Sequence, residues 1–327
     1  YSEIHISLLV LGLVSLGLAL ALVAPFTVCW FSRVKSFLFP GQVYELLPTL
    51  VSDTIHPNIM AGMLVMLLPF PLAVLLLGPQ ADLPPVDGTV PGVLAGVLDR
   101  RWLRWLGYAG ALLLMSGVLL LTKSRGAWMA GALIFALLLI RRYPRLLALI
   151  PITLLGVGLV VWQVGISTLL DTISTSGAVS GWAGRVDIWR RAMQMIQDFP
   201  FTGIGIGNFE TVANVFYPFF LAGSDANIPH AHNLLLQVGV DLGLLGLIAY
   251  LAIVFLSLWC ALDSMRSFMD VGNETMATIA WAGWVSLLAM LVQGMLDAAT
   301  WVIGRGSFVP WIVIGLVMTL HRMAYKK

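Results

Sequence analysis

Long apolar runs, separated by short polar segments, dominate the chain. The hydrocarbon core of a bilayer is about 30 Å thick, so an α-helix needs roughly 20 apolar residues to cross it. Eight runs come near or exceed that length: residues 6–30, 57–78, 103–122, 126–140, 146–164, 234–260, 277–296 and 302–320. The run 126–140 is the shortest and indicates a half-span or a helix that begins in a polar cavity. Barrel-type alternation is absent, and a lone strand cannot satisfy its backbone in lipid. The pattern therefore predicts an all-α, polytopic helical membrane protein.

The composition agrees with this prediction. Of the 327 residues, 59% are hydrophobic and only 10% are charged, whereas a soluble domain carries roughly 25% charged residues. These values exclude a soluble enzyme and a disordered chain. The net charge of +2 gives no strong field that would attract nucleic acid, so no nucleic-acid partner is expected.

Basic residues in short loops predict the orientation of the helices, because Lys and Arg accumulate on the cytoplasmic side. The turn 141–145 holds three arginines, and the chain ends on two lysines. With both on the cytoplasmic side, both chain ends are cytoplasmic. The predicted organisation has five spans in 1–164, a long outward-facing loop in 165–233 and three spans in 234–327. A loop of that length has a function or a structure of its own.

An amphipathic helix is predicted within this loop, beginning near Arg185 and ending before Pro200. The residues placed on its apolar face are Trp189, Ala192, Met193, Ile196 and Phe199. Such a helix lies on the membrane surface or under a lid. The glycine-rich segment that follows, Gly203-Ile-Gly-Ile-Gly207, has no strand before it, which rejects a dinucleotide-binding motif. It predicts a tight turn with glycines at positive φ.

Two histidines stand directly before the next apolar run, in the sequence Pro229-His-Ala-His-Asn233. Asn233 is a good N-cap for the following helix, and His232 would lie at the outer boundary of the membrane. Either His230 or His232 is a plausible general base, although a lone histidine is often structural. A zinc site needs a third ligand, and the loop offers none at a metal-like spacing, so no metal is expected.

Two arginines are candidate anion ligands. Arg125 follows Lys123-Ser between two apolar runs on the outer side, and Arg185 begins the loop helix, where backbone N–H groups favour an anion. Arginine grips phosphate oxygens in a bidentate manner, which lysine cannot do. The alternative for Arg125 is a side chain that snorkels at a helix end. For Arg191, an ordinary ion pair with Asp187 at i,i+4 is favoured.

Several acidic residues are further candidates. Asp241 and Gln237 fall inside the run 234–260, and a hydrogen bond to a neighbouring helix is the favoured explanation for both. Glu210 and Asp225 lie in the outer loop and could assist a reaction there.

Arginines that bind phosphate and a histidine that takes a proton suit the transfer of a group from a phosphate-activated lipid. Binding of the pyrophosphate leaving group stabilises the charge that develops as the bond breaks, while the base deprotonates an acceptor hydroxyl.

The same residues resemble those of a known family. Residues from about 105 to 260 are similar to the O-antigen ligase/polymerase membrane domain. The similarity rests on Leu-Thr-Lys-Ser-Arg-Gly-Ala-Trp at 121–128, Gly184-Arg185 with Trp189, the glycine motif 203–209, and His232-Asn233 followed by Gly243-Leu-Leu-Gly246. His-Pro-Asn at 56–58 is also similar to a turn of this family.

The resemblance implies a GT-C-like helical bundle in the bacterial inner membrane, with the loop 165–233 in the periplasm. It implies a metal-independent, inverting transfer of a glycan from undecaprenyl pyrophosphate to an acceptor hydroxyl, which in ligases belongs to lipid A–core. No cofactor is expected. By the family motifs, Arg125 and Arg185 bind pyrophosphate and His232 is the general base. His230, Asn233 and Lys123 are further substrate-binding candidates.

Other functions fit the same sequence. An O-antigen polymerase or a protein O-oligosaccharyltransferase shares the motifs, and the acceptor that is used would separate them. A transporter of bicarbonate or another small anion would use the basic cavity as an anion port, but the internal repeats typical of transporters are not evident. A structural membrane protein would tolerate alanine at both arginines.

Overall fold

A computed structural model describes residues 2–30, 44, 47, 51, 54–78, 101–165, 182–219, 228–301 and 306–325. Over this part of the chain the regular elements are helices, and extended pairing is limited to one isolated bridge between Val28 and Ile55. The prediction of an all-α protein is therefore confirmed.

The chain forms two compact units. Unit 1 comprises Tyr1–Leu138, Ile253–Gln293 and Gly304–Lys327, and unit 2 comprises Leu139–Ala252 and Gly294–Ile303. The helices of unit 1 are α1 (Glu3–Thr27), α3 (Pro57–Leu67), α4 (Pro69–Leu77), α6 (Arg101–Leu121), α13 (Glu274–Gly294), α14 (Val309–Ala324) and most of α7 (Arg125–Arg142). Unit 2 contains the short 3₁₀ helix η2 (Pro144–Ala148), α8 (Leu149–Val164), α10 (Trp182–Asp198) and α11 (Phe209–Phe216). The long α12 (Leu234–Asp270) begins in unit 2 and ends in unit 1.

The described residues contain six helices that are long and apolar enough to cross a membrane: Glu3–Thr27, Pro57–Leu77, Trp102–Leu121, Pro144–Val164, Leu234–Asp270 and Glu274–Gly294. They coincide with six of the eight predicted spans. The other two predicted spans are also helical. One is the shorter apolar helix α14, and the other is α7, which begins at Arg125 and ends on Arg141 and Arg142. The chain is a multi-pass membrane protein.

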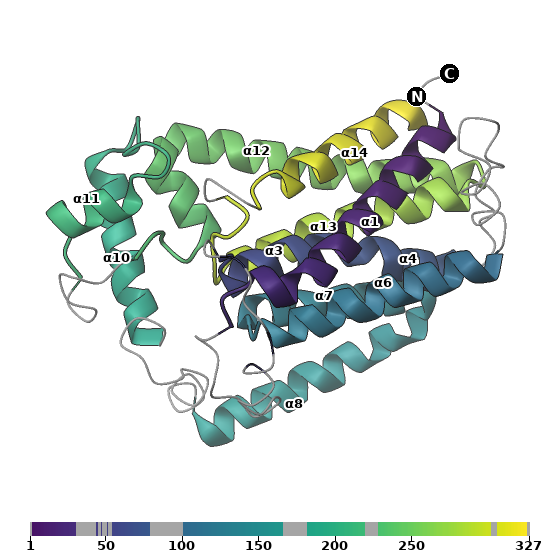
Figure 1. Cartoon of the computed structure of the whole chain (residues 1–327), viewed down its shortest axis with the longest axis horizontal. Helices are drawn as coiled ribbons and strands as arrows, with labels where there is room; N and C mark the ends of the chain where they lie inside the picture. The colour runs from purple at the N-terminus through teal and green to yellow at the C-terminus, as the bar shows by residue number, and fades with distance from the viewer. Residues whose placement is uncertain are drawn as a thin grey trace. The chain divides into compact units, whose positions relative to one another are not determined.

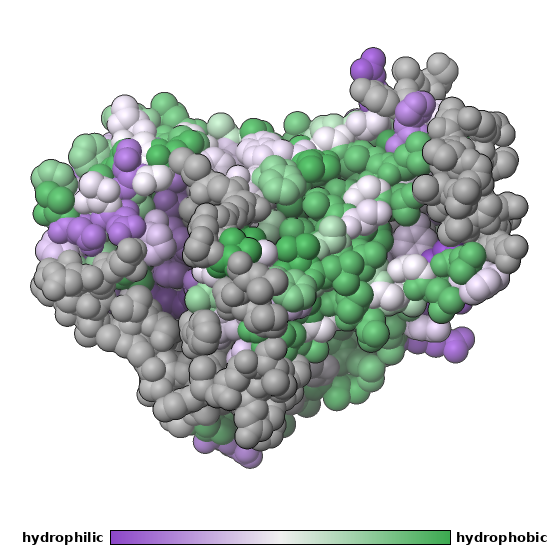
Figure 2. Space-filling view, viewed as in Figure 1, coloured by the Kyte–Doolittle hydropathy of each residue, from purple (hydrophilic) through white to green (hydrophobic). Residues whose placement is uncertain are grey.

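The helices of unit 1 pack against one another in a bundle (Figure 1). Helix α1 contacts α3 and α6, and α4 contacts α6. A Cβ atom at Gly17 of α1 would lie 2.6 Å from Cε of Met115 on α6, so the end of the Met115 side chain fills the space that this glycine leaves. Large apolar side chains of α1 point outward instead, among them Leu22 and Phe26. Figure 2 shows this hydrophobic surface over α1, as expected for a surface that faces lipid.

The start of α1 and the end of α14 lie at the same end of unit 1 (Figure 1). At the start of α1, Glu3 accepts a hydrogen bond from Asn273, which precedes α13. A cavity at this end is lined by residues from the starts of α1, α6 and α13, including Ser7, Arg104 and Thr275. At the end of α14, Tyr325 donates to Asp263 of α12. This arrangement agrees with chain ends on one side of a membrane, and the cytoplasmic side stays a prediction.

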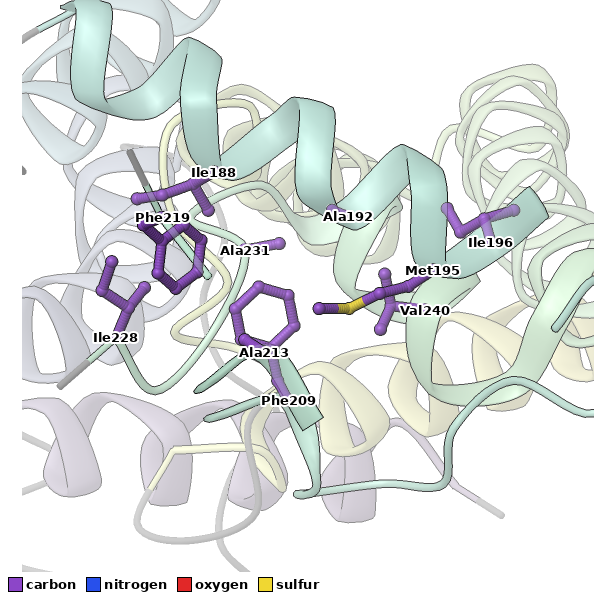
Figure 3. Close-up of a cluster of buried hydrophobic side chains, with 10 residues drawn as sticks. All are labelled: Ile188, Ala192, Met195, Ile196, Phe209, Ala213, Phe219, Ile228, Ala231 and Val240. Carbon is purple, nitrogen blue, oxygen red and sulfur yellow. The ribbon is translucent and has the colours of Figure 1, made fainter. Parts of the chain in front are cut away.

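The core of unit 2 forms where α10 packs against α11 and the turn before α12 (Figure 3). Its side chains are Ile188, Ala192, Met195, Ile196, Phe209, Ala213, Phe219, Ile228, Ala231 and Val240.

The predicted apolar face of the loop helix was only partly right. Ala192 and Ile196 are buried, but Met193 and Phe199 are 46% and 43% exposed, and Ile188 and Met195 take their places. The apolar residues of α10 cover a wide face of the helix, so the position of Phe209 and Ala213 decides which of them face the core.

The glycine turn after α10 binds to a break in α12. Gly203, Gly205 and Gly207 have φ values of 62°, 86° and 83°, which confirms the predicted tight turn. Helix α12 is interrupted at Gly243, where φ is 70°. Across this break Ile204 N donates to Val240 O at 2.8 Å, and Leu244 N donates to Pro200 O at 2.7 Å. The turn therefore supplies hydrogen-bond partners for backbone groups that a broken helix in a membrane would otherwise leave without them.

Gly203→Ala is expected to destabilise unit 2 strongly. A Cβ atom there would lie 2.4 Å from the backbone carbonyl of Asp241, and φ is +62°, so both the space and the backbone conformation oppose a side chain. Gly272→Ala is the matched control, because its φ is +73° but nothing lies within 4 Å of the added carbon. The control should cost about 1 kcal/mol from backbone strain alone. Thermal unfolding in detergent compares the two, and an equal fall in Tm would contradict the close approach.

Candidate active site

The two histidines are held in a rigid turn at the start of α12. The Asn233 side-chain oxygen accepts from Leu235 N at 3.0 Å and Leu236 N at 3.1 Å, which confirms the predicted N-cap. Ala231 N donates to the Gln237 side chain at 2.7 Å. His232 has a left-handed backbone, with φ of 49°, and its N–H donates to His230 Nδ1 at 3.1 Å. These bonds fix the backbone of the turn and orient the imidazole ring of His230 before any ligand arrives.

The segment Met295-Leu296-Asp297, directly after α13, brings the predicted residues of unit 2 together. Asn233 Nδ2 donates to Met295 O at 3.1 Å, and the Arg185 guanidinium donates to Leu296 O. Asp297 faces both histidines: its Oδ1 lies 3.8 Å from His230 Nε2, and its Oδ2 lies 3.7 Å from His232 Nδ1. Parts of the chain that are distant in sequence therefore meet at three consecutive residues.

Asp297 is a residue that the sequence analysis missed. It is only 3% exposed, and its two carboxylate oxygens face the two different rings. Among the acids considered earlier, Glu210 lies in the first turn of α11 and Asp225 lies outside the described residues. One sequence signal could have pointed to Asp297: it follows an apolar run whose outer end, by helix alternation, lies on the same side of the membrane as the histidines.

The hydrogen bonds indicate where the imidazole protons are. His230 Nδ1 accepts a backbone N–H, so the proton of neutral His230 is assigned to Nε2, which faces Asp297. For His232 it is Nδ1 that faces the carboxylate. A proton on that nitrogen would leave the Nε2 lone pair of His232 available to accept a proton from a substrate.

A second buried acid supports this arrangement. Asp241 accepts hydrogen bonds from Gln237 Nε2 and Trp301 Nε1, each at 2.9 Å. Its predicted role as a hydrogen-bonded structural group is confirmed, although Trp301 belongs to the segment after α13 and not to a helix. Because Gln237 also holds the backbone of Ala231, Asp241 links the histidine turn to this segment.

Two arginines of α10 have different surroundings: Arg191 is part of a structural pair, whereas Arg185 is a candidate ligand. Arg191 lies 3.9 Å from Asp187 and donates to Gln194 at 2.9 Å, which confirms the predicted structural pair. Arg185 instead reaches across to Leu296, beside Asp297. A cation near the N-terminus of a helix is unfavourable, because that end of the helix dipole is positive. An anion bound to Arg185 would offset this unfavourable interaction.

Lys123 and Arg125 occupy the turn between α6 and α7 in unit 1. Lys123 has φ of 51°, and its Nζ lies 4.2 Å from the ring centroid of Tyr44. Thr122 donates to Leu119 O at 2.7 Å and stabilises the turn, so that Arg125 is the first residue of α7. The structure thus brings together His230, His232, Asn233 and Arg185, whereas the convergence of Arg125 and Lys123 with them stays a prediction.

The sequence of this region matches a known family. Residues 110–251 match the O-antigen ligase family. The chain carries an O-antigen ligase domain. The matched region includes every site residue that the sequence predicted, and it agrees with the resemblance described above. Asp297 lies beyond it. Among curated proteins, none matches the chain significantly. The matched domain therefore supports a membrane enzyme of the O-antigen ligase or polymerase type.

Proposed function

We propose that this O-antigen ligase domain transfers a glycan from undecaprenyl pyrophosphate to a hydroxyl of lipid A–core, at the periplasmic face of the bacterial inner membrane. The observation that carries the proposal is the His232–Asp297 pair, which lies beside Arg185. An imidazole oriented by a buried carboxylate suits proton abstraction, and a guanidinium suits a pyrophosphate.

His232 is the general base in this proposal. Its Nε2 takes the proton of the acceptor hydroxyl, whose oxygen attacks the anomeric carbon of the donor sugar. The bond from that carbon to the pyrophosphate oxygen breaks, and undecaprenyl pyrophosphate leaves with the electron pair. A single displacement inverts the configuration at this carbon. Asp297 is a positioning residue that holds the proton on His232 Nδ1; the 3.7 Å gap would shorten when substrate binds.

The arginines bind the leaving group. Arg185 and Arg125 both lie in the first turn of a helix, so backbone N–H groups and the helix dipole add to the attraction for pyrophosphate. Stabilisation of the charge that develops there lowers the barrier without a metal ion, as the family resemblance implies. The Asn233 side chain caps α12 and bonds Met295, so its role is to position the histidine turn.

A transfer assay in proteoliposomes tests the function. The lipid-linked glycan is supplied with one of three acceptors: lipid A–core, a second lipid-linked repeat unit, or a peptide that carries serine and threonine. Transfer to lipid A–core, with inverted linkage and in the presence of EDTA, is the expected result. Transfer only to the repeat unit or only to the peptide would replace the ligase by a polymerase or a protein O-oligosaccharyltransferase. Bicarbonate uptake without transfer to any acceptor would overturn the enzymatic proposal.

A further inference from the structure

We propose that His230, His232 and Asp297 also form a binding site for a divalent transition-metal ion such as Zn²⁺, and that the bound ion blocks transfer. The ligand atoms of these three residues lie within 4.8 Å of one another, and they are the one such group among the described residues. The blocking effect rests on the proposed function of His232, whereas the binding does not.

The distances suit an ion between the three side chains. The two histidine–carboxylate gaps are 3.7 and 3.8 Å, too long for hydrogen bonds. Two ligand atoms bound to one zinc ion at about 2.1 Å lie roughly 3.4 Å apart in tetrahedral geometry. The two histidine–carboxylate gaps therefore need shifts of a few tenths of an ångström, and the ligand atoms of the group, which lie within 4.8 Å of one another, must also draw together around the ion. Two imidazoles and a carboxylate, with one position open, are a donor set that zinc accepts.

The surroundings favour this ion as well. The side chain of Asp297 is 4% exposed, and those of His230 and His232 are 13% and 21% exposed, so the donors are mostly enclosed but can be reached. A bound ion requires Nε2 of His230 to give up its proton to Nδ1, which displaces the N–H of His232. The loss of that hydrogen bond, and the two N–H groups that would then face each other, weaken the site without preventing binding.

Metal binding and base catalysis compete for the same imidazole. When a proton occupies Nδ1 of His232, its Nε2 carries the lone pair that accepts the substrate proton. When a metal ion occupies Nδ1, the remaining proton of the neutral ring must be on Nε2, and the base is lost. The Asp297 carboxylate stabilises either a proton or a metal ion on Nδ1 of His232. The enzyme is therefore active with the proton there and inactive with the metal ion.

The experiment uses the full chain in detergent and Co²⁺ as a spectroscopic probe. Wild type should bind one equivalent of Co²⁺ with visible absorption bands, and His230→Ala or Asp297→Asn should weaken that binding at least about tenfold. Asp297→Asn keeps the shape of the side chain, so loss of binding does not reflect loss of fold. His321→Ala is the matched control, because His321 lies 3.2 Å from Asp263 in unit 1 and forms a histidine–carboxylate pair of its own. It should bind Co²⁺ as wild type does.

Activity is then measured in metal-free buffer with added Zn²⁺. Transfer should fall to the level of His232→Ala and return when EDTA is added. Absence of Co²⁺ bands in wild type, equal bands in Asp297→Asn, or faster transfer with Zn²⁺ would overturn the inference. If the protein showed clear Co²⁺ bands but transferred no glycan in metal-free buffer, the metal site would be supported and the proposed function would be overturned.

Discussion

His232→Ala is expected to lower the rate of glycan transfer by about 10²–10⁴-fold, the usual contribution of a general base. The imidazole acts on the acceptor hydroxyl and not on the pyrophosphate, so donor affinity should change little. Initial rates in proteoliposomes measure the first effect, and binding of the lipid-linked donor to purified protein measures the second. Asp297→Asn should lower kcat by a smaller factor at unchanged donor KM, because a neutral amide stabilises the imidazolium of His232 less than a carboxylate does.

His321→Ala is the control for this result. It removes an imidazole that faces Asp263 at 3.2 Å, outside the proposed site, and should leave transfer unchanged. If His232→Ala weakened donor binding as much as it slowed transfer, His232 would be a ligand of the donor rather than the base. If Asp297→Asn raised the donor KM at unchanged kcat, a role in orienting His232 would be excluded.

Arg185→Ala is expected to reduce kcat/KM for the donor by roughly tenfold to a hundredfold for each charged hydrogen bond that is lost. Arg185→Lys should fail nearly as badly, because an ammonium group cannot bind two phosphate oxygens in the planar manner of a guanidinium. The loss should appear mainly in donor affinity and in the step that releases pyrophosphate. Transfer kinetics at varied donor concentration separate these effects.

Arg191→Lys is the matched control on the same helix. Arg191 pairs with Asp187 and bonds Gln194, and lysine can keep the ion pair, so transfer should persist. Full activity in Arg185→Lys would contradict the bidentate contact. Equal losses in Arg185→Lys and Arg191→Lys would indicate a general effect on the stability of α10.

Local rules account for what the sequence predicted correctly. The apolar runs became helices because an unpaired backbone is costly in lipid, whatever the neighbours are. Asn233 caps α12 because its side chain reaches N–H groups two and three residues ahead. The glycines at 203, 205 and 207 form a turn because positive φ is open to glycine. The family motifs around Arg185 and His232 lie within residues 110–251, which match the O-antigen ligase family.

The sequence by itself therefore determined the class of protein, the positions of its spans and the histidine turn, because each depends on residues that are close along the chain. Only the tertiary structure decided that Asp297 faces both histidines, that Arg185 meets Leu296, and that Ile188 and Met195 rather than Met193 and Phe199 face the core. These contacts join segments that are far apart in sequence, and such pairing leaves no periodic signal in either segment. It arises when the segment after α13 packs against α10 and α12, and helix alternation along the sequence indicates only that Asp297 lies on the same side of the membrane as the histidines.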